Sequence, residues 1–267
     1  MIHLREISLV GERKNNDVYP LNIPVVRGLD KLSFTSPVTV FVGENGSGKS
    51  TLLEAIARAA ELPVVGSEEV NRDATLKMLQ PLVDSIKLVW TKRTRRGFFL
   101  RTEDFFGFVK RVHELRFDML EELERVEREY RSRSEYAKNL AKMPAQSSVK
   151  ALEHRYGADL DAQSHGESFL ALFQSRCVPG GLYLLDEPEA ALSPISQLGL
   201  IAMIKDMVAK EAQFILATHS PILMAVPDAL LLNFDQAPPC GTTYDELEHV
   251  QLYRSFLSDP EAYLHRL

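Results

Sequence analysis

The chain contains only two cysteines, Cys177 and Cys240, among its 267 residues. They lie far apart in the sequence, and neither has a histidine at the spacing that zinc ligands require. A disulfide framework and a zinc site are therefore both disfavoured. Two reduced thiols are typical of a protein of the cytoplasm, which is the location that we expect.

The sequence also lacks any window that approaches the roughly eighteen uninterrupted apolar residues of a membrane span. Residues 1–6 carry no secretory signal and are expected to begin the first strand. An excess of positive charge is absent as well, because the formal net charge is −6. No global basic field therefore attracts nucleic acid or anionic lipid, which leaves only a local patch for such contacts. An apolar content of 45% is that of an ordinary soluble globular protein.

The most specific feature that is present is a complete phosphate-binding loop, G-x-x-x-x-G-K-[ST]. It follows the apolar run 38–42 and precedes a helix-like segment, 52–60, as the motif requires. Glycines let the backbone N–H groups curl around phosphate oxygens, Lys49 can reach the β- and γ-phosphates, and Ser50 can join the shell of Mg²⁺. The sequence therefore predicts a bound nucleoside triphosphate, with ATP as the default. The loop residues are Gly43, Glu44, Asn45, Gly46, Ser47, Gly48, Lys49, Ser50 and Thr51.

Two further apolar segments end in polar residues. The run 181–185 leads into Asp186 and Glu187, and the run 214–217 leads into His219. Buried parallel strands deliver such residues to the edge of the sheet where the phosphate loop lies. There Asp186 is suited to hold magnesium, Glu187 to act as general base on the attacking water, and His219 to contact the γ-phosphate.

A third segment, Ser164-His165-Gly166-Glu167-Ser168, opens a helix-like stretch at 169–176. Hydroxyl and amide groups at a helix N-terminus form an anion-binding arrangement. The same letters also fit a capping box between Ser164 and Glu167. The segment can serve both purposes if an incoming phosphate takes the place of the capping side chain at the helix N-terminus.

The order of the remaining segments predicts an α/β fold. Strands are expected at 2–10, 29–34, 182–185, 214–217 and 230–234, with an extended segment at 19–24. Residues 85–90 and 98–101 are expected to form a hairpin around a basic turn. Residues 104–140 are expected to form one charged helix whose apolar stripe packs on its own domain rather than on a partner helix, and 132–148 to be partly loop. The sequence thus predicts one domain, 1–267, with a mostly helical insertion at about 104–163.

These motifs, in this order, resemble the ABC-type ATPases. The resemblance identifies the phosphate loop with Walker A, 182–187 with Walker B, 190–193 with the D-loop and His219 with the switch histidine. The segment at Ser164 resembles a variant of the L-S-G-G-Q signature in which His165 replaces the first glycine and Glu167 the glutamine. The resemblance is closest to small stand-alone ATPases near the chromosome-maintenance and repair ATPases, and it implies a mixed sheet core with a helical lid.

One family feature has no clear counterpart, namely the glutamine of the Q-loop. Gln80 has a suitable position in the sequence but lies in a helix-like stretch. Glu103 or Arg101 is expected to take its place, with Glu103 also a candidate magnesium ligand. Tyr19 lies thirty positions before Lys49, where many ABC proteins stack an aromatic ring on adenine, although packing between prolines explains it equally well.

The resemblance implies a head-to-tail homodimer induced by ATP. In this dimer the Walker A loop of one subunit and the segment Ser164–Gly166 of the other enclose the nucleotide, and hydrolysis through Glu187 separates them. Three uses remain open: an ATPase that acts on DNA or a partner protein, the energy subunit of a transporter, and a nucleotide switch that does not hydrolyse. The basic turn Lys92-Arg93-Thr94-Arg95-Arg96, extended by Arg101 and interleaved with Phe98 and Phe99, favours a nucleic-acid contact.

Overall fold

The protein is built on a six-stranded, mostly parallel sheet. The computed structural model describes residues 1–10, 18–65, 78–156 and 165–265. Strands β5, β6, β7, β3 and β8 run parallel, and β9 pairs antiparallel with β8. The strand order is β5 (Gly97–Arg101), β6 (Leu182–Asp186), β7 (Gln213–Ala217), β3 (Val38–Val42), β8 (Leu230–Asn233) and β9 (Cys240–Thr242). The α/β fold class predicted from the sequence is confirmed.

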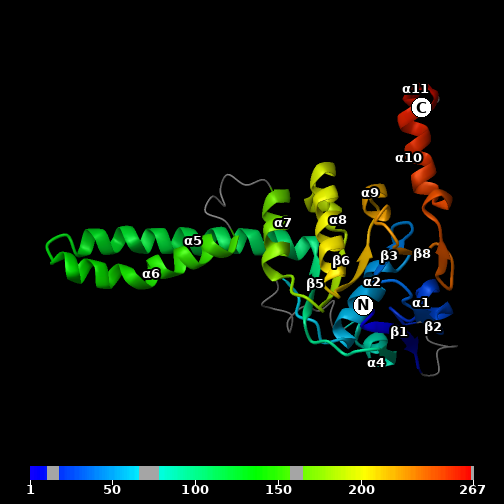
Figure 1. Cartoon of the computed structure of the whole chain (residues 1–267), viewed down its shortest axis with the longest axis horizontal. Helices are drawn as coiled ribbons and strands as arrows, with labels where there is room; N and C mark the ends of the chain where they lie inside the picture. The colour runs from blue at the N-terminus through cyan, green and yellow to red at the C-terminus, as the bar shows by residue number, and fades with distance from the viewer. Residues whose placement is uncertain (11–17, 66–77, 157–164, 266–267) are drawn as a thin grey trace.

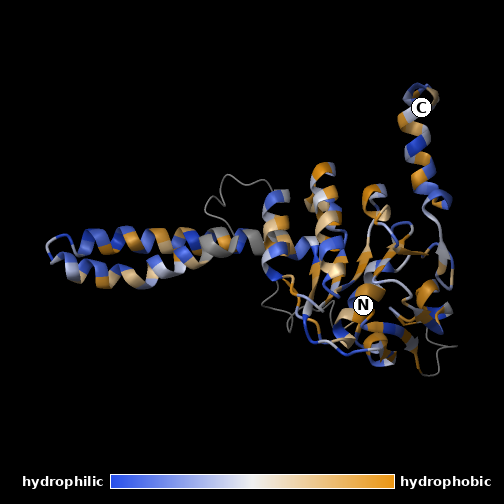
Figure 2. Ribbon diagram, viewed as in Figure 1, coloured by the Kyte–Doolittle hydropathy of each residue, from blue (hydrophilic) through white to orange (hydrophobic). Residues whose placement is uncertain are grey.

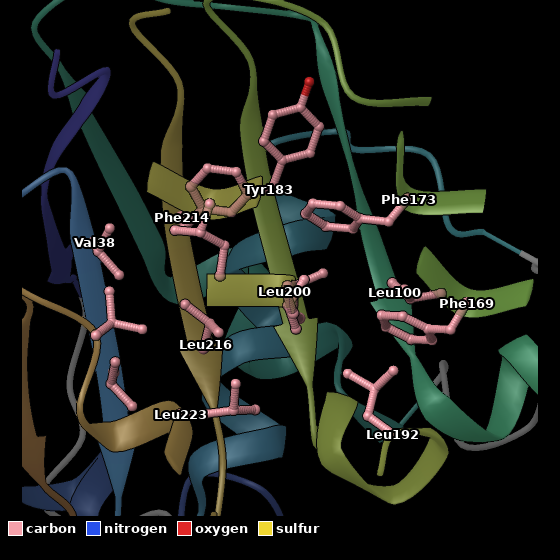
Figure 3. Packing of buried hydrophobic residues seen from close by; sticks show 14 of the residues in the cluster. Val38, Leu100, Phe169, Phe173, Tyr183, Leu192, Leu200, Phe214, Leu216 and Leu223 are labelled. Carbon is pink, nitrogen blue, oxygen red and sulfur yellow. The ribbon is translucent and has the colours of Figure 1, made fainter. Parts of the chain in front are cut away.

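Both faces of this sheet are buried, because successive side chains of a strand point to opposite sides. On β3, Val38, Val40 and Val42 belong to one hydrophobic cluster, while Phe41 belongs to the other. The first cluster is completed by aromatic and leucine side chains from the helices that cover this face, among them Phe173 and Leu200 (Figure 3). Continuous apolar strands are what a doubly covered parallel sheet requires.

Helices cover both faces of the sheet (Figure 1). The first face is covered by α7 (His165–Arg176), α8 (Pro194–Ala209) and α9 (Pro221–Met224). The second face is covered by α1 (Pro24–Gly28), α2 (Lys49–Ala59), α4 (Gln80–Ser85) and a small antiparallel sheet. That sheet has the order β2 (Lys31–Ser33), β1 (Leu4–Leu9) and β4 (Ile86–Trp90).

The hairpin expected at 85–90 and 98–101 is wrong. Strand β4 pairs with β1 in the small sheet, whereas β5 pairs in parallel with β6 in the large sheet. The physical reason is burial: Phe98, Phe99 and Leu100 are 5%, 1% and 2% exposed, which suits a strand covered on both faces. The basic turn therefore joins two sheets, and Phe98 and Phe99 are not available to stack on nucleotide bases.

The single helix expected at 104–140 is also wrong, because two helices pack side by side. They are α5 (Thr102–Glu129) and α6 (Glu135–Tyr156), and they project from the body as a hairpin (Figure 1). A turn separates them, and the Ser134 hydroxyl accepts a hydrogen bond from the N–H of Ala137 at the start of α6. Polar and apolar residues are mixed along both helices (Figure 2). Of the region 132–148, expected to be partly loop, residues 132–134 lie in the turn and residues 135–148 belong to α6.

The segment 19–24, expected to be extended, is a turn that leads into α1. Pro24 begins this short helix, where its missing N–H has no cost. A short 3₁₀ helix, η1 (Pro188–Ala191), follows β6. After β9 come a second one, η2 (Tyr244–Glu246), and the helices α10 (Glu248–Ser258) and α11 (Pro260–Leu264). Helices α10 and α11 extend away from the sheet (Figure 1).

Gly97→Ala is expected to destabilise the protein by more than about 2 kcal/mol. Gly97 has φ +126°, and a Cβ atom there would lie 1.8 Å from the carbonyl oxygen of Leu182, its register partner in β6. Urea unfolding followed by circular dichroism measures the loss. Gly107→Ala in α5 is the control, because no described atom lies within 4 Å of its Cβ position. Gly107→Ala should raise the free energy of unfolding by up to about 1 kcal/mol. Equal changes in the free energy of unfolding for Gly97→Ala and Gly107→Ala would contradict the strain argument.

Candidate active site

The phosphate loop joins the end of β3 to the start of α2. Gly48 is the N-cap of α2 in the left-handed conformation, with φ 97°. The first helical hydrogen bond is donated by Leu52 to the Gly48 carbonyl, so the N–H groups of the preceding turn lack helical partners. Such groups, together with the helix dipole, attract phosphate. A Cβ atom at Gly48 would lie 2.9 Å from Ile23 Cγ2, which explains why this position needs glycine.

Lys49 lies inside this loop and is only 3% exposed. Its Nζ donates hydrogen bonds to the carbonyl oxygens of Gly43 and Glu44, both at 2.8 Å. Burial lowers the pKa of Lys49, and the carboxylate of Asp235 opposes this shift most strongly. A bound triphosphate would add negative charge beside this buried ammonium and so favour its charged form.

Ser50 and Asp186 meet across the end of the sheet. The Ser50 hydroxyl donates to Asp186 Oδ1 at 2.8 Å, and burial raises the pKa of Asp186 to about 6. A cavity of about 280 Å³ opens beside them, and its lining includes Tyr19, Glu103 and Glu187. Because Mg²⁺ prefers oxygen ligands and leaves several positions to water and phosphate, this pair fits a magnesium ion.

Glu187 and His219 end neighbouring strands and face each other. His219 Nε2 lies 3.7 Å from Glu187 Oε1. Glu187 has the left-handed φ of 47°, and its N–H donates to the carbonyl of Ala217 at 2.9 Å. Backbone strain of this kind is concentrated at functional sites. Burial, and then the charge of Lys49, lower the pKa of His219, which favours the neutral imidazole.

One cavity of about 290 Å³ brings half of the predicted site residues together. It is lined by loop residues from Asn45 to Thr51 except Ser47, by Glu187 and His219, and by Tyr19 and Ile23. Tyr19 is 47% exposed and lines both small cavities, a position open to a base. Gly43, Glu44 and Ser47 line a third cavity, of about 890 Å³, on the side of the loop that faces β8 and α10.

The three candidates for the Q-loop residue, Arg101, Glu103 and Gln80, differ in their contacts. Arg101 forms an ion pair with Glu54, so its guanidinium is already engaged. Glu103 is exposed in the first turn of α5 and lines the cavity that holds Ser50 and Asp186. Gln80 is exposed in α4 and donates to Asp84 at 2.7 Å, and it lines none of the three cavities. Of the three, Glu103 is therefore the residue positioned to reach a bound metal.

The signature segment does not reach the phosphate loop within the described part of one chain. Ser164 lies outside the described residues, and α7 begins at His165. Gly166 is buried against α8, where a Cβ atom would lie 3.0 Å from Ser196 Oγ. Glu167 is exposed, and no described residue of α7 lines the three cavities.

Sequence reasoning missed three residues that contact the site. Asp235 Oδ1 accepts a hydrogen bond from the N–H of Glu44 at 2.7 Å, and His249 Nε2 lies 3.4 Å from Glu44 Oε1. Glu189 Oε1 accepts from the N–H of His219 at 2.6 Å. Asp235 carried a usable signal, since it follows an apolar strand, as Asp186 does. Glu189 and His249 lie in segments without such a pattern.

Asp235→Ala is expected to weaken ATP binding by about 10-fold, because the loop loses the acceptor that fixes the N–H of Glu44. Asp235→Asn keeps an acceptor and should retain most of the affinity. Equilibrium titration with a fluorescent ATP analogue measures both variants. An equal loss in the two would mean that the charge of Asp235, which acts on Lys49, matters rather than the hydrogen bond.

Comparisons with known proteins identify the family to which the chain is similar. A protein-family description, "AAA domain, putative AbiEii toxin, Type IV TA system", matches residues 92–225, and another, "AAA domain", matches residues 22–60. The cobalt import ATP-binding protein CbiO of Salmonella typhimurium is 28% identical over 214 residues, which are 78% of this chain and 72% of that protein. The glutamine transport ATP-binding protein GlnQ of Escherichia coli is 25% identical over 196 residues, 73% of this chain and 75% of that protein.

A solved structure of the Smc head domain bound to the C-terminal domain of ScpA, from Pyrococcus furiosus, aligns over 96% of this chain and 100% of that one. The identity is 14% and the TM-score is 0.47. In the described part of the chain, no helix combines the length and apolar character needed to cross a membrane.

Proposed function

Because this chain belongs to the AAA-domain family whose description matches residues 92–225, we propose that it couples Mg²⁺-dependent ATP hydrolysis to ATP-induced pairing of two copies. It is an ATP-binding ATPase domain of the AAA and ABC type. The observation that carries the proposal is the cavity in which Lys49, Glu187 and His219 meet around the phosphate loop.

The residues around this cavity have complementary roles in phosphoryl transfer. The loop N–H groups and Lys49 bind the β- and γ-phosphates and stabilise the charge that moves toward the leaving oxygen. Glu187 accepts a proton from the water whose oxygen attacks the γ-phosphorus, and the bond to ADP breaks. The neutral His219 donates or accepts one hydrogen bond at the γ-phosphate. Magnesium, when bound, supplies charge neutralisation, and Ser50 and Asp186 are the residues that would hold it.

Phosphate release from ATP tests the hydrolytic step. The purified protein is expected to release phosphate with Mg²⁺ and to stop when EDTA is added, because the buried Asp186 and Ser50 then lack their cation. Binding of a fluorescent ATP analogue is measured in parallel. Binding without any phosphate release would favour the alternative, a nucleotide switch that does not hydrolyse.

The second half of the proposal is a head-to-tail dimer. It is supported by the position of α7, whose described residues line none of the cavities around the loop of their own chain. A second subunit would bring its Ser164, His165 and Gly166 to the γ-phosphate. Two such sites would then close over two ATP molecules, so the nucleotide joins the subunits until hydrolysis releases them.

Size-exclusion chromatography with Glu187→Gln protein, which should hold ATP unhydrolysed, tests the dimer. We expect a monomer without nucleotide and a dimer with ATP and Mg²⁺. Ser164→Arg should leave ATP binding nearly intact but suppress both dimerisation and turnover, because a bulky charge enters the shared site. A protein that stays monomeric with ATP, or unchanged turnover in Ser164→Arg, would contradict the shared site.

The partner of this ATPase is proposed from its exposed basic turn. Lys92, Arg93, Arg95 and Arg96 are all exposed, whereas Phe98 and Phe99 are buried. A contact there would be to the phosphate backbone of DNA rather than to bases, and therefore steeply dependent on salt. DNA should raise ATP turnover at low salt and lose this effect at high salt. If DNA has no effect at low salt, two alternatives remain. One is a protein partner, and the other is a transport system, as the names of CbiO and GlnQ suggest. Copurification with a membrane protein would identify the transport system.

A further inference from the structure

Glu189 joins the segment after Walker B to the loop that carries His219. It lies in η1, two residues after Glu187, and its Oε1 accepts a hydrogen bond from the N–H of His219 at 2.6 Å. Its other oxygen, Oε2, is buried and has no hydrogen-bond partner among the described residues. A buried carboxylate is costly to maintain, so its retention calls for a specific role.

A second set of hydrogen bonds holds the same loop from the other side. The Ser220 hydroxyl donates to Gln197 Oε1, and the Gln197 side-chain amide donates to the carbonyl of Leu192 at 3.2 Å. Ser220 also accepts the N–H of Ile222 at 3.1 Å as the N-cap of α9. The loop 218–220 is therefore fixed by backbone and hydroxyl contacts to residues 189–197.

In the described part of the chain, the imidazole of His219 has no hydrogen bond like the one that holds its backbone N–H. Its Nε2 is buried without a hydrogen-bond partner among the described residues, and Glu187 Oε1 is 3.7 Å away, beyond hydrogen-bond distance. The His249 ring is 6.1 Å away, centroid to centroid. The backbone of His219 sets the direction of its Cα–Cβ bond and so the positions that the imidazole can reach, and Glu189 holds the N–H of that residue.

We propose that Glu189 is a positioning residue for ATP hydrolysis, acting through His219 by holding its backbone so that the imidazole faces Glu187 and the γ-phosphate. This inference rests on the proposed function, because it assigns His219 a part in turnover. The competing role is a structural one, in which Glu189 only stabilises the turn after β7. The two differ in one respect: a positioning residue has no effect on turnover once the residue that it positions is gone.

A double-mutant cycle between Glu189 and His219 separates these roles. Glu189→Ala is expected to lower kcat by about 10-fold through misplacement of the imidazole, with KM for ATP changed less than about two-fold. His219→Ala should lower kcat at least as much, and the double variant should match His219→Ala alone. Glu189→Gln keeps an acceptor of the same length and should restore most of the turnover. Additive losses in the double variant, or full turnover in Glu189→Ala when His219→Ala is slow, would overturn the inference.

Histidine NMR of the nucleotide-free protein provides a readout that needs no hydrolysis. The chain has seven histidines, and the His219 ring signals are assigned by their loss in His219→Ala. Glu189→Ala should shift these signals and leave those of His3 in place, because the buried His3 ring bonds to the carbonyls of Lys92 and Glu211 far from the site. Unshifted His219 signals would refute the positioning role. Normal turnover in His219→Ala combined with shifted signals in Glu189→Ala would instead remove His219 from the proposed catalytic mechanism.

Discussion

Glu187→Gln is expected to lower the turnover number for ATP by at least about 100-fold while ATP affinity changes less than about two-fold. Glutamine has the shape of glutamate but cannot take the proton of the attacking water. Glu187 is well placed for this task, because its backbone is fixed by the hydrogen bond to the Ala217 carbonyl while its side chain is 47% exposed in the cavity. Single-turnover phosphate release and analogue titration measure the two quantities separately.

Glu61→Gln is the matched control for this change. Glu61 is an exposed glutamate that pairs with Arg93 and lies outside the three cavities. The turnover number of the Glu61→Gln variant should therefore equal that of the unchanged protein. If Glu187→Gln keeps more than about a tenth of the turnover, proton transfer to Glu187 is not the step that limits hydrolysis. The assignment of the general base would then be wrong.

The core of the site could be predicted because it depends on short-range patterns. Each residue proposed to act in hydrolysis follows an apolar strand, and parallel strands place such residues on one edge of the sheet. Asp186 and His219 were found in this way, and Walker A by its own spacing. The same rule would have found Asp235, which follows β8. Glu189 has no such signal, since its importance comes from a hydrogen bond to a residue thirty positions later.

The arrangement of β4 and β5 could not be predicted in the same way. These strands are close in the sequence, yet each pairs with a distant strand. Strand β4 pairs with β1 near the start of the chain, and β5 pairs with β6 much later in the chain. Long-range pairing of this kind is decided by which faces are buried, and neighbouring residues do not report it. The break between α5 and α6 was missed for a related reason. Residues 130–134, Tyr-Arg-Ser-Arg-Ser, also suit the exposed surface of one long charged helix, and the packing of α6 on α5 favours a turn there.

Lys49→Met is expected to remove most of the stabilisation that ATP gives to the folded protein. Binding at 100 times Kd raises the free energy of unfolding by about 2.7 kcal/mol, which appears as a higher Tm. Methionine fills nearly the same volume, but it leaves Asp235, Glu187, Asp186 and Glu44 around the phosphates without the buried ammonium that offsets their charge. Repulsion of the triphosphate should then lower affinity at least about 10-fold.

Thermal unfolding with and without ATP and Mg²⁺ measures this loss and also tests the fold. The Tm of Lys49→Met without nucleotide should stay close to that of the unchanged protein, because removing a desolvated charge offsets the lost hydrogen bonds to Gly43 and Glu44. Lys205→Met on the exposed side of α8 is the control and should keep the full increase with ATP. If Lys49→Met shows the same increase as the control, the N–H groups of the loop and the dipole of α2 bind the phosphates without it, and Lys49 acts in turnover alone.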